Sequence, residues 1–161
     1  MTDEKSLLLL QLQKHIDDEL MSLQKSVDSA AEAATHPEAK PENKYDTRGL
    51  EASYLAGAQK ERVGELKAAL LWLKSTQLKS FGALDKIAPT ALVSLEHEGQ
   101  MSWCFLMAWG AGYALQWEGH PVLTITPQSP LGEALLGKTQ GELATVRTAQ
   151  GIREYEIVQV S

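Results

Sequence analysis

Apolar residues recur at alternating spacings of four and three along the first part of the chain. Polar residues fill most positions between the members of this series, which are Ile16, Leu20, Leu23, Val27, Ala30 and Ala34. Leu9 extends the series backward, and neither proline nor glycine occurs from Thr2 to about Ala34. A mean period of 3.5 residues is typical of a helix that packs along a narrow coiled-coil seam. The pattern predicts a helix of about 30 residues, roughly 45 Å long.

The run 7–10 is apolar around more than one face of this helix, so we expect it to pack against something larger than one helix. A second helical pattern follows, with apolar positions at Leu50, Leu55, Val63, Leu66, Leu70 and Leu73. We expect this second helix to begin within 43–47 and to end near Lys79. Helices of similar length joined by a short turn pack antiparallel. Residues 1–80 are therefore predicted to form an antiparallel coiled-coil hairpin.

The stretch between the two helices contains Pro37 and Pro41. Proline removes a backbone donor and clashes with the preceding turn, so the hairpin tip is predicted near residues 36–48. The tip carries three carboxylates, Glu38, Glu42 and Asp46. Carboxylates are common in exposed turns, and a solvated tip is the plain interpretation. Carboxylates are also the ligands that Mg²⁺ prefers, so handling of this ion is the functional alternative.

The pattern changes after a linker at 82–89 to short alternating segments bounded by turns. The predicted strands are 91–97, 101–109, 113–117, 122–126, 144–148 and 153–160. One helix is predicted within this region, because Ser129 suits the N-cap, Pro130 the first helical position and Gly137 the stop. Residues 84–161 are therefore predicted to form an α+β domain, a small and mostly antiparallel sheet with one short helix.

Composition narrows the class of protein. The chain has 161 residues, of which 43% are hydrophobic, enough for a core. The net charge of -6 argues against sequence-independent binding to duplex DNA. The single Cys104 excludes an internal disulfide, and its apolar neighbours predict a buried, inert thiol. The apolar run 7–10 is too short to span a bilayer, so we expect a cytoplasmic protein that does not contact membranes.

Other residues whose side chains could bind a metal or a partner do not show a spacing typical of a functional site. The histidines, His15, His36, His97 and His120, have no ligand spacing, so metal binding by them is not expected. Trp103, Trp109 and Trp117 are expected to share one face of the sheet, either as core or as a patch that binds a partner. The cations of the second helix, Lys60, Arg62, Lys67 and Lys74, are interpreted as a solvated face.

Three motifs follow one another after position 128: 129–138 (Ser-Pro-Leu-Gly-Glu-Ala-Leu-Leu-Gly-Lys), then Gly141-Glu142, then Gly151 followed by 154–158 (Glu-Tyr-Glu-Ile-Val). In order and spacing they resemble the C-terminal domain of the bacterial Gre transcript-cleavage factors. Gre factors consist of an antiparallel coiled coil with an acidic tip and an FKBP-like domain. The resemblance thus implies an FKBP-like fold for residues 84–161.

The resemblance also implies a function. Gre factors bind bacterial RNA polymerase: the C-terminal domain docks at the rim of the secondary channel, and the coiled coil reaches the active site. There the tip carboxylates help to hold a second Mg²⁺ shared with the polymerase, which then cleaves backtracked RNA. By this resemblance Glu38, Glu42 and Asp46 are the Mg²⁺-assisting candidates. The candidates for the docking surface are Ser129, Pro130, Leu131 and Gly132.

The chain would then be an accessory factor and not an enzyme. We expect a monomer that holds no metal stably by itself and meets the nascent RNA 3′ end only indirectly. The tip departs from the family pattern of Gly-Asp, two residues, Glu-Asn and then Glu-Tyr. Pro37-Glu38 replaces Gly-Asp, Glu42 follows Glu38 by four residues, and Lys44 replaces the acid before the tyrosine.

Two further functions stay open. One is a regulator that enters the channel without promoting cleavage and competes with Gre factors. The other, based only on the FKBP-like domain type, is a prolyl isomerase or chaperone.

Overall fold

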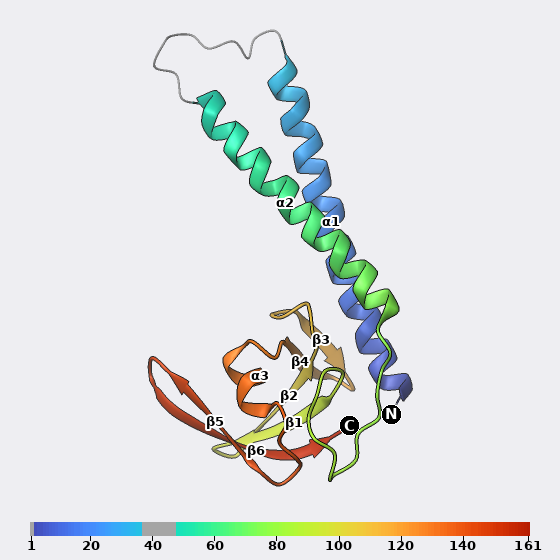
Figure 1. Ribbon diagram of the computed structural model, residues 1–161, viewed down its shortest axis with the longest axis vertical. Coiled ribbons are helices and arrows are strands. Elements are labelled where there is room, and N and C mark those ends of the chain that lie inside the picture. Colours follow the sequence, from blue (N-terminus) through green and yellow to red (C-terminus); the bar gives the residue numbers. More distant parts are fainter. Residues whose placement is uncertain (1, 37–47) are drawn as a thin grey trace. The chain divides into compact units, whose positions relative to one another are not determined.

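The computed structural model describes residues 2–36 and 48–161. The elements in chain order are α1 (Thr2–Thr35), α2 (Arg48–Ser75), β1 (Leu92–His97), β2 (Gln100–Leu106), β3 (Ala114–Trp117), β4 (His120–Ile125), α3 (Pro130–Leu135), β5 (Leu143–Thr148) and β6 (Gly151–Val160), as Figure 1 shows. Their packing forms two compact units. The hairpin unit comprises Lys14–Lys74, and the sheet unit comprises Met1–Gln13 together with Ser75–Ser161. The first turns of α1 thus pack with the sheet, although they precede the hairpin in sequence.

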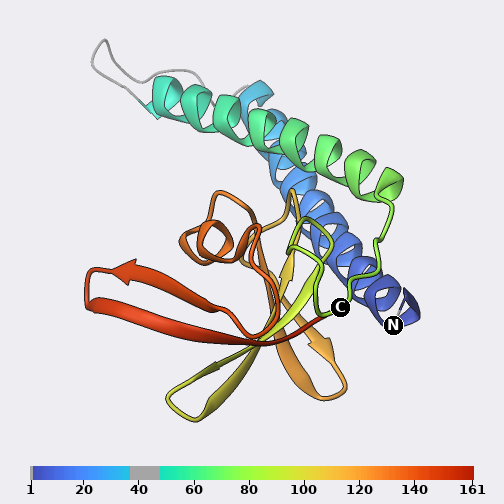
Figure 2. The ribbon, with the colours of Figure 1, turned by 60° about the horizontal axis from the view of Figure 1, so that its bottom comes forward.

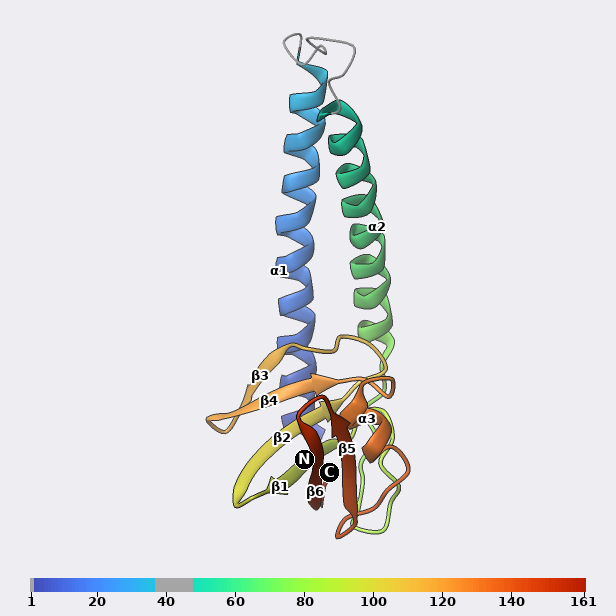
Figure 3. The same cartoon turned by 90° about the vertical axis from the view of Figure 1, so that its left-hand side faces the viewer.

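In the hairpin unit, α1 and α2 lie side by side and run antiparallel (Figures 1 and 3). The predicted seam of α1 is confirmed from Ile16 to Val27, both of which are buried, with half-buried leucines between them. On α2 the buried residues are Val63, Leu66, Ala69, Leu70 and Leu73. The helix ends at Ser75 and not near Lys79 as predicted. These apolar faces account for the pairing of the helices, because burial removes their surface from water.

Two predicted seam positions of α2 are wrong. Leu50 and Leu55 are 59% and 62% exposed. Gln59 Nε2 donates to Ser26 Oγ at 3.5 Å, and this register places the earlier residues of α2 opposite the alanine-rich end of α1. Alanines such as Ala30 and Ala34, themselves exposed, offer too little apolar surface to cover a leucine.

The sheet unit contains a six-stranded sheet with the order β3-β4-β2-β1-β6-β5 (Figure 2). All neighbouring strands are antiparallel except β2 and β4, which are parallel. After β2 the chain runs to the edge as β3 and returns as β4, which lies between β3 and β2. β2 ends at Leu106 and not at Trp109 as predicted, because the chain turns at Gly110, where φ is 85°.

Side chains alternate between two faces of this sheet. One face forms the main core with α3 and with the segment before β1; its members include Phe81, Ile87, Val93, Leu95, Cys104, Leu106, Ile125, Leu135 and Ile157. The predicted burial of Cys104 is confirmed. Burial raises the pKa of the Cys104 thiol to about 12. The residues between these core positions along the strands belong to the other face of the sheet. Among them, Phe105, Leu115 and Val122 are also fully buried. Leu8 and Leu12 of α1 are buried completely as well.

Candidate functional site

The helices of the hairpin lead to the predicted acidic tip. α1 ends at Thr35, whose hydroxyl donates to the carbonyls of Ala31 at 3.2 Å and Glu32 at 2.9 Å. α2 begins at Arg48. The three predicted Mg²⁺-assisting residues, Glu38, Glu42 and Asp46, lie outside the described residues. Their role therefore stays a prediction, and the structure describes the helix ends that flank them.

An ion-pair cluster joins the two helices in the middle of the hairpin unit. The Arg62 guanidinium donates through Nη2 and Nε to Glu19 Oε1 at 2.9 and 3.2 Å, and through Nη1 to Glu65 Oε2 at 3.1 Å. All three side chains are partly exposed, so the pairs contribute about 1 kcal/mol or less each. The ion pairs specify geometry more than they add stability. Because two nitrogens of the Arg62 guanidinium donate to Glu19, the pair favours one register between α1 and α2. The lysines of α2 at 60, 67 and 74 are exposed, as a solvated face requires.

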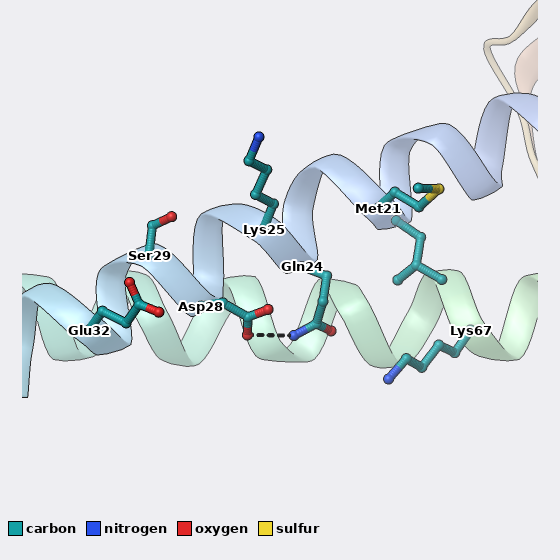
Figure 4. A pocket seen from close by; sticks show the side chains of 8 residues that line it. Met21, Gln24, Lys25, Asp28, Ser29, Glu32 and Lys67 are labelled. Atoms are coloured by element: carbon teal, nitrogen blue, oxygen red, sulfur yellow. Dashed lines mark hydrogen bonds between the residues drawn. The ribbon is translucent and has the colours of Figure 1, made fainter.

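A shallow groove of about 570 Å³ lies along the same unit (Figure 4). Its lining residues are Leu20, Met21, Gln24, Lys25, Asp28, Ser29, Glu32 and Lys67. Gln24 Nε2 donates to Asp28 Oδ1 at 3.0 Å across one helical turn, as the dashed line in Figure 4 shows. Lys25 and Ser29 point away from α2 in this view, whereas Lys67 comes from α2. The groove offers polar groups of both signs and no convergent set of ligands.

The predicted docking residues form the start of α3. Ser129 is the N-cap: its Oγ accepts from Gly132 N at 3.1 Å and donates to Thr126 O at 2.7 Å. Gly137 has φ 79°, as expected for a helix stop. Gly132 is buried, Leu131 packs against the main core and Pro130 is exposed. The local role of these residues is thus structural, and a role in docking stays a prediction.

Two of the predicted tryptophans lie together. Trp103 and Trp117 line one small cavity, whereas Trp109 is not among its lining residues. The Trp103 ring also stacks on the His120 ring, with centroids 4.3 Å apart and an interplanar angle of 21°. In the described ranges, no group of three or more His, Cys, Asp or Glu side chains could hold a metal ion.

Sequence reasoning missed Lys5, a lysine inside the sheet unit. Its side chain is 1% exposed, and its Nζ donates to the carbonyls of Lys79 and, at 3.1 Å, Thr90. The Nζ also lies 5.0 Å from the centroid of the Phe81 ring. Lys5 precedes Leu8 by three residues and so lies on the buried stripe of α1. This spacing was the one indication in the sequence that Lys5 is buried. A lysine in a charged N-terminal turn is, however, usually exposed to solvent.

Burial gives Lys5 a measurable pH dependence. Desolvation lowers the pKa of the Lys5 ammonium to about 8, below the value of about 10.4 for an unfolded chain. Between these pH values the unfolded chain binds a proton that the folded chain lacks, so this group makes stability rise with pH. We expect the free energy of unfolding of the wild type, relative to Lys5→Met, to increase from about pH 8 to about pH 10 in denaturant titrations.

The Lys5→Met reference matters because Cys104 acts in the opposite sense over the same pH range. Its raised folded-state pKa makes the unfolded chain lose a proton first, which lowers stability as the pH rises. Subtracting the Lys5→Met variant cancels this contribution, since Cys104 is present in both proteins. A difference in stability that stayed constant from about pH 7 to about pH 10 would contradict the lowered pKa of Lys5.

The sequence of this chain is similar to those of known proteins. A family model described as transcription elongation factor GreA/GreB, C-terminal, matches residues 85–161. The transcription elongation factor GreA of Methylococcus capsulatus is 30% identical over 134 residues, which are 83% of this chain and 80% of the relative. GreA of Alkalilimnicola ehrlichii is 29% identical over the same shares of both chains. The crystal structure of the GreA factor homolog 1 (Gfh1) of Thermus thermophilus aligns with 95% of this chain and 92% of its own, with 22% identity and a TM-score of 0.40.

The family rests on the sequence relatives, and the fold agrees with it. The two long helices that run antiparallel, and the mostly antiparallel sheet with one short helix, confirm the predicted α+β arrangement of elements. No helix within the described ranges is long and apolar enough to cross a membrane. With 30% identity across 83% of its length, the chain belongs to the GreA/GreB family of transcription elongation factors.

Proposed function

We propose that this protein binds bacterial RNA polymerase through the secondary channel and that its tip carboxylates modulate the polymerase active site. The observation that carries the proposal is the antiparallel pair α1 and α2, whose flanking ends at Thr35 and Arg48 enclose an acidic segment. The 28 residues of α2 correspond to roughly 42 Å of helix. Such a hairpin can carry a few side chains into a deep channel that a globular domain could not enter.

The chemistry of the tip fits an accessory role. Glu38, Glu42 and Asp46 supply only carboxylate oxygens, which suit Mg²⁺ and not a softer metal. Mg²⁺ usually takes one or two protein carboxylates and completes its shell with water and phosphate oxygens. The three carboxylates would therefore hold the ion only together with groups of the polymerase. A second Mg²⁺ held in this way would stabilise the attacking and leaving oxygens when the polymerase cleaves backtracked RNA.

The departures in the tip support a second candidate of the same class. Lys44 stands where the family has an acid, and Pro37-Glu38 stands where it has Gly-Asp. A cation beside the carboxylates weakens their attraction for Mg²⁺. The alternative is therefore a regulator that occupies the channel without promoting cleavage and competes with Gre factors.

The isomerase alternative receives less support from the sheet unit. Such an enzyme needs an aromatic pocket for a proline ring. The cavity lined by Trp103 and Trp117 has a volume of about 30 Å³, far below the roughly 300–1,000 Å³ of small-molecule pockets.

A cleavage assay tests the proposed function. We expect added protein to shorten the labelled transcript of a stalled, backtracked polymerase complex in the presence of Mg²⁺. The triple variant Glu38→Gln, Glu42→Gln, Asp46→Asn should reduce cleavage to the background of the polymerase, because it replaces three carboxylates by neutral amides of nearly the same size. The matched control, Glu32→Gln with Glu51→Gln, removes two exposed carboxylates just outside the tip and should cleave normally.

Competition with GreA separates the remaining outcomes. Failure to shorten the transcript, together with displacement of GreA, would replace cleavage by channel occupancy as the function. Failure in both measurements would contradict polymerase binding altogether. Equal loss of cleavage in the triple variant and the control would contradict the assignment of the three tip residues.

A further inference from the structure

The two edges of the sheet differ in how their backbone groups are satisfied. At one edge the side chain of Gln11 pairs with the backbone of β3: Gln11 Nε2 donates to Gln116 O at 2.8 Å, and Gln11 Oε1 accepts from Gln116 N at 2.8 Å. The other edge is β5, which has β6 on one side and no strand on the other. The β5–β6 hairpin, red in Figure 2, extends away from the rest of the sheet unit. An uncovered edge strand is a template for pairing with a further strand.

The pairing of β5 with β6 identifies which backbone groups are open. Ile157 N donates to Glu142 O at 3.0 Å at the start of this pair. Residues along an antiparallel strand alternate between bonding to one neighbour and pointing away from it, so the N–H and C=O of Leu143, Thr145 and Arg147 point away from β6. All three residues are exposed, and no hydrogen bond joins these outward groups to another element of the described chain. They are therefore available to a further strand.

The side chains at these positions share one face of the sheet with a charge that has no counter-ion. Leu143 lies directly opposite Glu156 of β6. Glu156 also lies opposite Glu96 of β1, and like charges in directly opposite positions destabilise a sheet. Neither Arg147 nor Glu156 forms an ion pair within the described ranges. The open edge thus combines an exposed leucine, an unpaired cation and an unpaired carboxylate.

We propose that β5 pairs antiparallel with β5 of a second copy of this chain, with the two-fold axis at Thr145. A two-fold axis lets the same surface of both copies form the contact. In this register Thr145 lies opposite Thr145 of the second copy, and Leu143 lies opposite Arg147 of the second copy. Each of these pairs exchanges two backbone hydrogen bonds, because the outward groups of both strands face each other. The two sheets would then continue into one another.

The charges favour this register. Arg147 of the second copy lies beside Leu143, and Glu156 follows one strand further on, at two strand spacings or roughly 10 Å. The long arginine side chain spans this distance together with the glutamate, so its alkyl stem covers Leu143 while its guanidinium approaches Glu156. The carboxylate that faces Glu96 within one copy thereby gains a cation. Symmetry forms the same contact twice.

Other arrangements fit the edge less well. An in-register parallel pair would place Arg147 beside Arg147 of the second copy, and these like charges repel. Nucleic acid would meet the carboxylates of Glu154 and Glu156 on the same face, which repel phosphate. A strand of another protein can use the same backbone groups, but only a second copy supplies Arg147 opposite Leu143. The monomer expected from the sequence would then be the form of the protein at low concentration.

Analytical ultracentrifugation of the full chain tests the pairing. We expect the mass to rise from 17.6 kDa toward twice this value between low micromolar and millimolar concentration. Thr145→Pro should abolish this rise, because it removes an N–H that points away from β6, a position where an edge strand tolerates proline. Thr145→Val keeps the N–H and suits a strand, so this matched control should still dimerise.

Charge reversal tests the register and does not depend on how Thr145→Pro folds. Arg147→Glu and Glu156→Arg should each raise the dissociation constant roughly tenfold, because each places like charges together at two symmetric sites. The double variant restores opposite charges and should dimerise like the wild type. Glu61→Arg, an exposed change in the hairpin unit, controls for net charge. A wild type that stays monomeric at millimolar concentration, or a double variant as weak as the single ones, would overturn the proposal.

Discussion

Replacing Gly132 by alanine should destabilise the sheet unit by about 3 kcal/mol or more. A Cβ atom at this position would lie 1.9 Å from Thr126 O, 2.8 Å from Thr126 C and 2.9 Å from Ser129 Oγ. The obstacle is backbone and not a flexible side chain. Thr126 O already accepts from Ser129 N at 2.9 Å and from Ser129 Oγ at 2.7 Å, so moving it breaks the capping contacts of α3. Urea titration followed by the tryptophan signals of the sheet measures the loss.

Gly64→Ala is the matched control for this substitution. Gly64 lies inside α2, and a Cβ there meets nothing within 4 Å. Alanine in a helix interior is favoured over glycine, so the control should raise stability by about 0.5–1 kcal/mol. Gly132→Ala with stability equal to the wild type would show that the turn before α3 adjusts freely, contrary to the packing described above.

Truncating Leu8 to alanine should cost about 2–5 kcal/mol of unfolding free energy, and the loss should appear in the sheet unit. Leu8 is completely buried, and it belongs to the part of α1 that packs with residues after Ser75. The prediction is that the indole signals of Trp103 and Trp117 report unfolding at lower urea concentration. The reason is the lost apolar burial together with the cavity that remains.

Leu7→Ala isolates the effect of burial from that of helix propensity. Leu7 is 62% exposed on the neighbouring position of the same helix, so its truncation should change stability by about 0.5 kcal/mol or less. Equal effects of the two substitutions would contradict the burial of Leu8. Destabilisation by Leu8→Ala that spared the sheet tryptophans would contradict the inclusion of the first turns of α1 in the sheet unit.

Local signals in the sequence predicted the elements well where one short segment decides its own conformation. The seam from Ile16 to Val27 follows from periodicity alone, because a helix with one apolar stripe must bury that stripe. The start and stop of α3 follow from Ser129 and Gly137, since capping depends on residues within one turn. The α3 segment was also one of the motifs that carried the resemblance, which the sequence relatives then confirmed as family membership.

Local signals failed where the outcome depends on what the partner segment offers. Leu50 and Leu55 match the seam, yet the alanines of α1 leave them exposed. Lys5 reads as a solvated charge, yet three acceptors of distant segments surround it, two carbonyls and an aromatic ring. The need for glycine at position 132 is also invisible in the sequence, because the clashing carbonyl belongs to the preceding strand-to-helix turn.

The sequence by itself determined the helical hairpin, the change to strands after the linker, the buried thiol and the family to which the chain belongs. Each of these rests on periodicity, turn chemistry or motif spacing, which act within a few residues. Only the tertiary structure decided the strand order with its one parallel pair, the packing of the first turns of α1 with the sheet, and the burial of Lys5 against the carbonyls of Lys79 and Thr90. These depend on long-range packing and on the rule that buried polar groups need partners, and distant segments supply both.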